Sequence, residues 1–416
     1  MEGLLGANGG STDDDATSTV LHLIRTSQAR TRSELSRIGN LGRTVVSRCI
    51  RELIDVGLVF DGETTISNGG RAPRELCFNA DAGVLLVAEF GATAVTVGVT
   101  DLAGKMLATA GGAWQIEAGP DESLNHIVEA MRSVQTKAAG RRVWGVGVGL
   151  PGPVEFATGR PTSPPIMPGW DGYDVRARLG EVFDAPVWVD NDVNVMALGE
   201  LRAGAAVGER DVVVLKIGTG IGAGLISEGH IHRGAQGSAG DVGHVPVIGT
   251  SFDVLCRCGR TGCLEAVAGG AAIVRSASAA AADGSSPFLA AVVAGDRPII
   301  VSDVIAGAVH GDGACMTLLT TAARHIGDVL ATIVNIYNPS LVVLGGAVTS
   351  AGDSFLATIR QQVYLRSSPL ATRDLRVVRS TLGQLGAAVG TAHMVLDELF
   401  VAGCLADGAP LWDLFP

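Results

Sequence analysis

The chain has 416 residues, a formal net charge of −11 at pH 7 and a hydrophobic content of 47%. This length exceeds one compact domain, and the acidic balance argues against a protein that coats nucleic acid over its whole surface. No apolar run reaches the length of a membrane span and no signal peptide is recognisable, so we expect a cytoplasmic protein without a membrane partner. Residues 1–16, rich in Gly, Ser and Asp, are expected to be a disordered lead-in, and residues 401–416 a C-terminal tail.

Charge is distributed unevenly between the N-terminal segment and the remainder. Residues 17–78 contain nine arginines and six acidic residues, so their net charge is +3 and that of the rest is −14. A basic head on an acidic body is typical of a DNA-binding module joined to a soluble domain, although a mosaic surface can give the same split by chance. We call residues 17–80 the head and the chain from Asp81 onward the body.

The residue pattern of the head predicts three short helices followed by two strands. Thr31 and Glu34 have capping-box spacing at the start of the second helix, which Gly39 ends. A third helix is expected from about Gly42 to Val56. Polar residues near its start lie on its outer face, where a recognition helix contacts bases and phosphates. They are Arg43, Thr44, Ser47 and Arg48. A merely solvated helix face has the same polarity, so the pattern alone leaves both interpretations open.

Two strands are expected after the third helix. The first follows Gly57, a turn is expected at Asp61-Gly62, and the second strand spans residues 75–78. Arginines stand in and next to the Gly-rich run before this second strand. They are Arg71 and Arg74.

The body alternates apolar strands, glycine-rich turns and helices. Its clearest strands are 84–89, 94–100, 212–217 and 341–344. The first two flank the turn Glu89-Phe90-Gly91-Ala92-Thr93, the third precedes the loop Gly218 to Gly224, and the last ends in Gly345-Gly346. One glycine loop also fits an ordinary hairpin. Two such hairpins in this order resemble the duplicated phosphate clamp of the actin-like ATPase fold.

A run of polar residues follows another apolar strand of the body. Strand 186–189 leads directly into Asp190-Asn191-Asp192-Val193-Asn194 and then into a helix. Polar groups at the carboxyl end of a strand in such a sheet face the ligand crevice, so we expect a ligand site here. The alternative is that Asp190 or Asp192 only caps the helix.

Three cysteines lie close together in the second half of the body. Cys256, Cys258 and Cys263 share a loop with two glycines and can converge on one tetrahedral ion, with His244 as the fourth ligand. A closed Cys3His site has no open coordination position, so the expected ion is a structural zinc. The alternative, free cysteines in a tight turn, leaves the continuation Cys-Gly-x-x-Gly-Cys-Leu-Glu unexplained.

With Gly243-His244 upstream, this cysteine motif resembles the zinc motif of the ROK family (repressor, open reading frame, kinase), which contains sugar kinases and sugar-responsive repressors. The resemblance implies an α/β protein with the duplicated actin-like (ribonuclease-H-like) fold. Its first lobe would be residues 81–190, completed by a C-terminal helix at about 385–400, and its second lobe residues 191–384 with the zinc loop. The run Gly-Gly-Arg-x-Pro-Arg that ends at Arg74 resembles the wing of ROK repressors. It implies a winged helix-turn-helix domain over residues 17–80, with Arg71 and Arg74 near the minor groove.

The same resemblance assigns roles in the body. It makes Asp192 the catalytic base, which accepts a proton from a sugar hydroxyl as that hydroxyl attacks ATP. The sugar contacts that it implies are Asn191, Asp192, Asp241, His244 and Glu265. The contacts that it implies for ATP and magnesium are Glu89, Gly91, Thr93, Gly218, Thr219, Gly220, Gly222, Gly345 and Gly346.

Three positions depart from the family pattern. Glu89 stands where the family has Asp, Ile166 where many of its kinases have Asn, and Asp241 where it usually has Glu. Each change alters the reach or polarity of a contact, and buried polar contacts discriminate strongly between ligands. We therefore predict an altered sugar preference and weakened binding of a metal-nucleotide complex.

These features predict a sugar-responsive transcriptional regulator, with repression as its expected action. It would bind operator DNA as a homodimer or tetramer and hold a sugar or phosphosugar between its lobes. The alternative is an ATP-dependent sugar kinase that carries a DNA-binding head, which Asp192 and the glycine loops keep open. A third interpretation makes the body only a dimerisation platform, which leaves four polar residues unexplained: Asn191, Asp192, His244 and Glu265.

Overall fold

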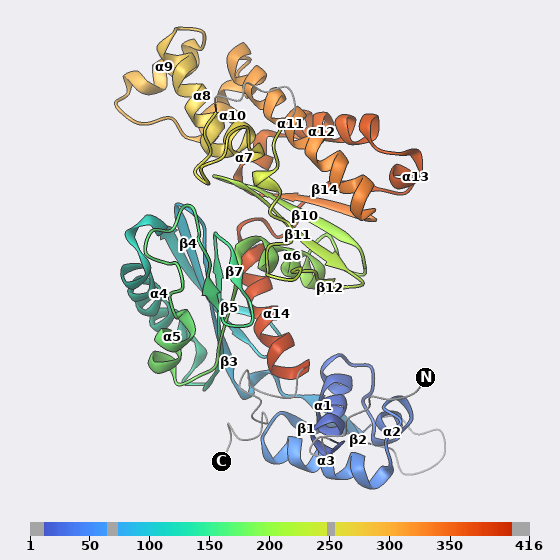
Figure 1. Ribbon diagram of the computed structural model, residues 1–416. Helices are drawn as coiled ribbons and strands as arrows, with labels where there is room; N and C mark the ends of the chain where they lie inside the picture. The colour runs from blue at the N-terminus through green and yellow to red at the C-terminus, as the bar shows by residue number, and fades with distance from the viewer. Residues whose placement is uncertain (1–11, 65–73, 248–253, 402–416) are drawn as a thin grey trace.

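The computed structural model describes residues 12–64, 74–247 and 254–401. Figure 1 shows three parts in chain order: a small N-terminal part in blue and two sheet-containing lobes. We call lobe 1 the part built on the sheet of β3, β4, β5, β6 and β9, and lobe 2 the part built on the sheet of β10 to β14.

The N-terminal part contains the expected three helices and two strands. The helices are α1 (Thr12–Arg25), α2 (Arg32–Ile38) and α3 (Arg43–Asp55), and the antiparallel strands are β1 (Val59–Thr64) and β2 (Arg74–Phe78). The predicted capping box is present, because the Thr31 hydroxyl accepts a hydrogen bond from Glu34 N while the Glu34 carboxylate accepts one from Thr31 N. Leu21, Ile50 and Leu53 are fully buried and join α1 to α3 in a hydrophobic core that continues into α6 and α14.

Two details of this part differ from the prediction. Helix α1 begins at Thr12, inside the segment expected to be a disordered lead-in, because an amphipathic helix with buried residues from Ala16 onward already starts there. The turn expected at Asp61-Gly62 is wrong. Both residues lie within β1, where Asp61 pairs with Leu76 and a bulge precedes Thr64. The ladder continues past the Asp-Gly pair, so the connection between the strands lies outside the described residues.

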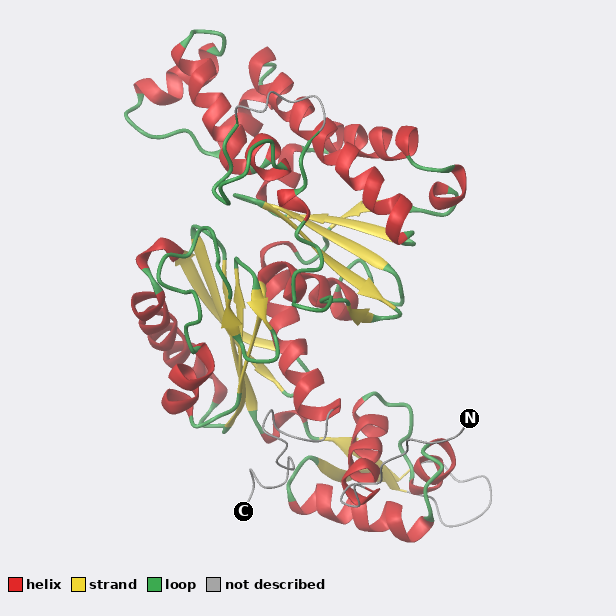
Figure 2. Ribbon diagram, viewed as in Figure 1, coloured by secondary structure: helices red, strands yellow, loops and turns green. Residues whose placement is uncertain are grey.

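Lobe 1 contains a five-stranded sheet in the order β5-β4-β3-β6-β9. The strands are β3 (Val84–Phe90), β4 (Ala94–Asp101), β5 (Met106–Ala113), β6 (Val143–Leu150) and β9 (Val187–Asn191), and a two-stranded hairpin follows β6 as β7 (Val154–Glu155) and β8 (Arg160–Pro161). Every residue of β3 and β6 is buried, as expected for central strands covered on both faces. Helices α4 (Pro120–Gln135) and α5 (Val175–Phe183) cover one of these faces (Figure 2).

Lobe 2 repeats this arrangement, with the strand order β12-β11-β10-β13-β14. The strands are β10 (Val212–Ile217), β11 (Ile221–Ser227), β12 (His230–Ile231), β13 (Leu341–Gly345) and β14 (Arg376–Arg379). The outer helices are α7 (Leu264–Ala268), α8 (Gly270–Ala282), α9 (Pro287–Ala294), α10 (Val301–Val309), α11 (Gly313–Tyr337), α12 (Asp353–Arg366) and α13 (Pro369–Thr372). In each lobe an antiparallel meander of three strands is followed by two strands added in parallel, so the duplication predicted from the glycine hairpins is present.

Two further helices, α6 (Asp192–Ala203) and α14 (Gly386–Val401), lie between the two sheets (Figures 1 and 2). They cross closely because glycines face backbone atoms of the other helix. A Cβ atom at Gly390 would lie 1.6 Å from the Val195 carbonyl oxygen, and one at Gly199 would lie 2.1 Å from the Gly386 carbonyl oxygen. The N-terminal half of α14 is thus held against the helix that begins at Asp192.

The other end of α14 reaches the N-terminal part of the molecule, as Figure 1 shows. The Phe400 ring packs edge-on against Phe78 with 5.9 Å between ring centroids, and the Arg25 guanidinium lies 5.4 Å from the Phe400 ring centroid. One helix therefore contacts both the region between the lobes and the N-terminal part. None of the helices in the described ranges is long and apolar enough to cross a lipid bilayer.

Candidate functional site

A cleft of about 2330 Å³ lies between the two lobes. It is lined by the ends of β3, β9, β10 and β13 and by the loops that follow them, which is where open α/β sheets place ligands. Every body position predicted to contact sugar or nucleotide lines this cleft. They are Glu89, Gly91, Thr93, Asn191, Asp192, Gly218, Thr219, Gly220, Gly222, Asp241, His244, Glu265, Gly345 and Gly346.

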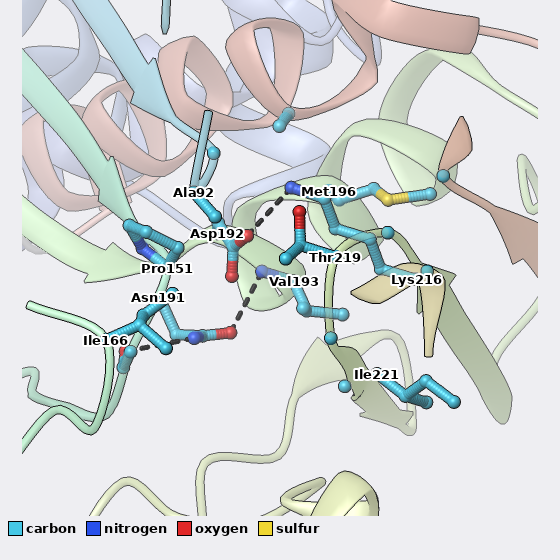
Figure 3. Close-up of a pocket in the computed structure, with 18 of the residues that line it drawn as sticks. Ala92, Pro151, Ile166, Asn191, Asp192, Val193, Met196, Lys216, Thr219 and Ile221 are labelled. Atoms are coloured by element: carbon cyan, nitrogen blue, oxygen red, sulfur yellow. Dashed lines mark hydrogen bonds and ion pairs between the residues drawn. The ribbon is translucent and has the colours of Figure 1, made fainter. Parts of the chain in front are cut away.

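Asn191 joins β9 to α6 and is the N-cap of that helix. Its side-chain oxygen accepts hydrogen bonds from Val193 N at 2.9 Å and Asn194 N at 3.3 Å, and its Nδ2 donates to the Gly152 carbonyl oxygen at 3.0 Å (Figure 3). The alternative that Asp190 or Asp192 caps this helix is therefore wrong. The Asn191 amide ties the start of α6 to the loop that follows β6, and Asp192, the next residue, lines the cleft.

Asp190 is held by a neighbour that the sequence did not identify. Its carboxylate is 2% exposed and accepts hydrogen bonds from Arg233 Nε at 2.8 Å and from Asn194 Nδ2 at 2.9 Å. The Arg233 guanidinium also lies 3.7 Å from the centroid of the Phe156 ring. Asp190 thus fixes the geometry of the polar run, since a buried carboxylate is stable only when it is paired and hydrogen-bonded.

Asp192 faces a half-buried lysine, Lys216, across the floor of the cleft. Lys216 Nζ lies 2.7 Å from Asp192 Oδ2 and 2.8 Å from Glu89 Oε1, and Figure 3 shows the pair formed with Asp192. Burial raises the pKa of Asp192 against the opposing effect of Lys216, and the charge of Glu89 raises it further. Burial alone would lower the pKa of Lys216, but the two carboxylates raise it above its usual range. The ammonium group therefore stays protonated, and Asp192 binds a proton more readily than an exposed aspartate does.

The glycine loops form the side of the cleft that belongs to lobe 2. Gly346 has a φ of +91°, and a Cβ atom there would lie 2.4 Å from the Ile217 carbonyl oxygen, so only glycine fits beside β10. The carbonyl oxygens of Gly218 and Thr219 accept hydrogen bonds from Gly270 N and Ala271 N at 2.8 and 3.0 Å. N–H groups at a helix start are a usual place for phosphate, and here two of them at the start of α8 are bonded to the loop itself.

The four predicted metal ligands converge beside the cleft. The ligand atoms of His244, Cys256, Cys258 and Cys263 all lie within 4.8 Å of one another. Cys258 Sγ is 3.7 Å from Cys263 Sγ, and Cys256 Sγ is 3.6 Å from His244 Nδ1. A tetrahedral zinc with Zn–S bonds of about 2.3 Å would hold its sulfur ligands about 3.8 Å apart. Both the donor set and its spacing therefore fit zinc.

The cysteine loop also positions two groups at the edge of the cleft. His244 turns Nδ1 toward the sulfurs, while its Nε2 lies 3.9 Å from Asp241 Oδ1. Glu265 lies at the start of α7, with Oε1 3.7 Å from Cys256 Sγ and Oε2 3.4 Å from the donor Ile221 N. The Asp241 side chain is 48% exposed. Ile166, the apolar departure from the family pattern, lines the same cleft.

The predicted DNA-contacting residues that the structure describes belong to the N-terminal part and do not line the cleft. Arg43, Thr44 and Ser47 are exposed at the start of α3, whereas Arg48 is half-buried and its Nε lies 4.0 Å from Glu52 Oε1. Arg74 is exposed at the start of β2. Arg71 lies outside the described residues.

The sequence patterns did not predict a role for two charged residues near the cleft, Lys216 and Arg233. Lys216 is the one charged residue in the apolar strand Val212–Ile217, directly before a glycine loop. A lysine in a buried strand needs a counter-charge, so this was a usable signal. Arg233 lies in an irregular segment between β12 and the cleft, where nothing in the local sequence marks its partner.

Residues 86–398 match the model of the ROK family. The chain belongs to this family. It is 28% identical to the xylose repressor of Caldicellulosiruptor bescii over 382 residues, which cover 91% of this chain and 95% of that protein. A solved ROK family transcriptional regulator, a homologue of Escherichia coli Mlc, has a TM-score of 0.79 and 26% identity, covering 94% of this chain and 98% of its own. A ROK family glucokinase from Streptomyces griseus, solved in complex with glucose and AMPPNP, has a TM-score of 0.64 and 30% identity, covering 75% and 99%. The predicted actin-like fold of the ROK sugar kinases is thereby confirmed.

Proposed function

We propose that this ROK protein is a sugar-responsive transcriptional repressor, which binds operator DNA through its head and a sugar between its lobes. The coverage of its relatives carries the proposal. The match to the xylose repressor spans 382 residues, whereas only 336 residues (416 minus 80) follow Ala80, so that match includes part of the head. The glucokinase structure covers 75% of the chain. The similarity to the kinase therefore extends over a length that the body alone can supply, whereas the similarity to the repressor extends over the body and part of the head.

In this proposal residues 17–80 form a winged helix-turn-helix domain. Helices α2 and α3 are the helix-turn-helix, with Arg43, Thr44 and Ser47 exposed at the start of the recognition helix. Strands β1 and β2 form the wing, with Arg74 at the start of β2. Arg71, three positions earlier in the sequence, would be the second arginine of this wing. The net charge of +3 over residues 17–78 favours contact with phosphates. A homodimer or tetramer would place two such heads on a two-fold symmetric operator.

The sugar or phosphosugar would lie beside the polar run at the start of α6. Asp192 offers a carboxylate to a hydroxyl group, and Asp241, His244 Nε2 and Glu265 line the same cleft beside the predicted metal ligands. Asn191 supports the site through its cap and its bond to Gly152. Ile166 replaces a polar contact with an apolar one, so the preferred sugar would differ from that of kinases with Asn there.

A structural zinc would hold this edge of the site in place. The ligands would be Cys256, Cys258, Cys263 and Nδ1 of His244, because the measured spacings match tetrahedral zinc. The metal would fix the ring of His244 so that Nε2 stays directed at Asp241 and the cleft. The ion is structural in this proposal, since four protein ligands leave no position for a water molecule.

Helix α14 provides the physical connection between the sugar and the DNA-binding head. It contacts α6 through Gly390 and contacts the head through Phe400 and Arg25. A ligand that prefers one position of α6 would shift α14 and with it the head. Coupling of this kind requires no contact between sugar and DNA.

The alternative function is an ATP-dependent sugar kinase, with glucokinase-like phosphoryl transfer to a hexose hydroxyl. The 30% identity to the glucokinase structure and the raised pKa of the Asp192 carboxyl both favour it. Residual activity of this kind would use Asp192 as the base.

Two measurements on the full chain separate these functions. The first is calorimetric titration with D-xylose, D-glucose, N-acetylglucosamine, xylose 5-phosphate, glucose 6-phosphate and N-acetylglucosamine 6-phosphate. One of these ligands should bind tightly, and the Asp192→Asn substitution should weaken its binding. A coupled ADP-release assay with the same sugars should show no release above the rate without sugar. Robust ADP release that Asp192→Asn abolishes would establish the kinase instead, and failure of every sugar to bind would refute a sugar-responsive protein.

A further inference from the structure

Lys216 forms an ionic bridge between the two lobes at the floor of the cleft. It lies on β10 of lobe 2, two residues before Gly218, and reaches Glu89 on β3 of lobe 1 and Asp192 at the start of α6. The two N–O distances, 2.8 and 2.7 Å, are those of strong charge-assisted hydrogen bonds. Figure 3 shows the lysine side chain directed at Asp192 from the side of Thr219 and Met196.

All three groups of this bridge are largely shielded from water. The exposed fractions of the side chains are 21% for Lys216, 11% for Glu89 and 10% for Asp192. The two carboxylates outweigh the effect of burial and keep the pKa of Lys216 above its usual range. The ammonium is therefore a permanent positive charge at this point, and each carboxylate already has one oxygen engaged by it.

The donor set does not fit a nucleotide-bound magnesium ion. Magnesium requires near-octahedral oxygen ligands at about 2.1 Å and tolerates displacement poorly. The carboxylate that the family pattern places near this ion is Glu89, and Asp192 is the acidic group beside it; Lys216 Nζ lies within hydrogen-bonding distance of both. An ion bound to the same oxygens would meet the ammonium charge at short range in a site of low dielectric. The glycine loop beside it also engages two N–H groups at the start of α8.

We propose that Lys216 is a built-in counter-ion that takes the place of the divalent cation of a nucleotide, so that the cleft closes on a sugar without a metal-nucleotide complex. The proposal rests on the sugar-binding function proposed above. In this arrangement the bridge holds β3, β10 and the start of α6 together, and Asp192 accepts a hydrogen bond from the sugar while it remains paired with Lys216.

The test compares manganese binding by the zinc-replete full chain and its Lys216 variants. Free Mn²⁺ is measured by electron paramagnetic resonance, with and without AMPPNP. The wild type and Lys216→Arg, which keeps the charge, are expected to bind no specific Mn²⁺. Lys216→Met is expected to gain one Mn²⁺ site and to bind Mn²⁺ at least about tenfold more tightly than Lys216→Arg does, because two buried carboxylates lose their counter-ion. The double variant Lys216→Met with Asp192→Asn should lose that gain.

Two outcomes would overturn the proposal. One is a wild-type chain that binds one Mn²⁺ together with AMPPNP. The other is a folded Lys216→Met variant that binds no more Mn²⁺ than Lys216→Arg. If Lys216→Met does not fold, calorimetry of AMPPNP binding to the wild type, with and without Mg²⁺, provides the test. The proposal predicts that Mg²⁺ does not increase the affinity for AMPPNP, and an increase would overturn it. Sugar titrations in the same buffers keep the two proposals apart, because a chain that binds no sugar refutes the repressor function whatever its manganese result.

Discussion

The close crossing of α6 and α14 makes Gly390 the position where one methyl group should do the most damage. The Cβ atom of Gly390→Ala would lie 1.6 Å from the Val195 carbonyl oxygen and 2.6 Å from Gly199 N. Restoring an ordinary 3.4 Å contact to the oxygen requires the helices to separate by about 1.8 Å. Such overpacking costs about 3 kcal/mol, and the better helix propensity of alanine returns about 1 kcal/mol. We expect Gly390→Ala to lower the free energy of unfolding by about 2 kcal/mol or more.

Urea unfolding followed by tryptophan fluorescence measures this loss, since Trp144 and Trp188 belong to the core that contains α14. Gly313→Ala is the matched control, because a Cβ atom there meets nothing within 4 Å at the first turn of α11. The control should unfold at the wild-type urea concentration or slightly above it. A Gly390→Ala chain with the stability of the control would refute the tight crossing, and with it the path from the cleft to the head.

Three further predictions address the metal, His393 and the head. Cys258→Ser should reduce the zinc content from about one ion per chain and lower the unfolding temperature. Cys77→Ser, the control, should retain the metal. Elemental analysis measures the zinc content and a thermal melt measures the unfolding temperature. Burial lowers the pKa of His393 to about 4, so the folded chain stays neutral there while the unfolded chain gains a proton below about pH 6.5. Stability should therefore fall by up to about 3 kcal/mol as the pH drops from 6.5 to 4, and urea titrations of His393→Gln should show a flatter profile. Arg43→Ala should weaken operator binding by about tenfold or more and reduce its salt dependence, while Arg132→Ala on α4 should change neither. Fluorescence anisotropy at two salt concentrations measures both effects. Equal operator affinity of the two variants would refute the role of Arg43 in DNA binding.

Local patterns were enough to predict the framework of this protein. The apolar strands around the glycine hairpins are specified by their own residues, and the four metal ligands lie within one short stretch of chain. The capping box at Thr31 depends only on Glu34, three residues later. Features of this kind can be predicted because the residues that form them are close together in the sequence.

The features that the sequence did not predict depend on contacts between segments that are distant along the chain. Lys216 pairs with Glu89, which stands 127 positions earlier in the chain, so the local pattern could mark the lysine as needing a counter-charge but could not identify its partner. The Asp61-Gly62 turn failed because pairing of Asp61 with Leu76 extends β1 past a dipeptide that would otherwise favour a tight turn. The cap of α6 is Asn191 rather than an aspartate, because the position of Gly152 gives its amide a second use.

Binding of DNA in the presence and absence of sugar tests the central claim most directly. Duplexes selected by the full chain from a random-sequence pool provide the operator, and anisotropy titrations then compare affinities with and without the sugar that binds tightest. A sugar-responsive repressor should select a two-fold symmetric sequence, and the sugar should change its affinity by about tenfold or more, a response that Asp192→Asn abolishes. Selection of no sequence, or an affinity that the bound sugar leaves unchanged, would contradict the account.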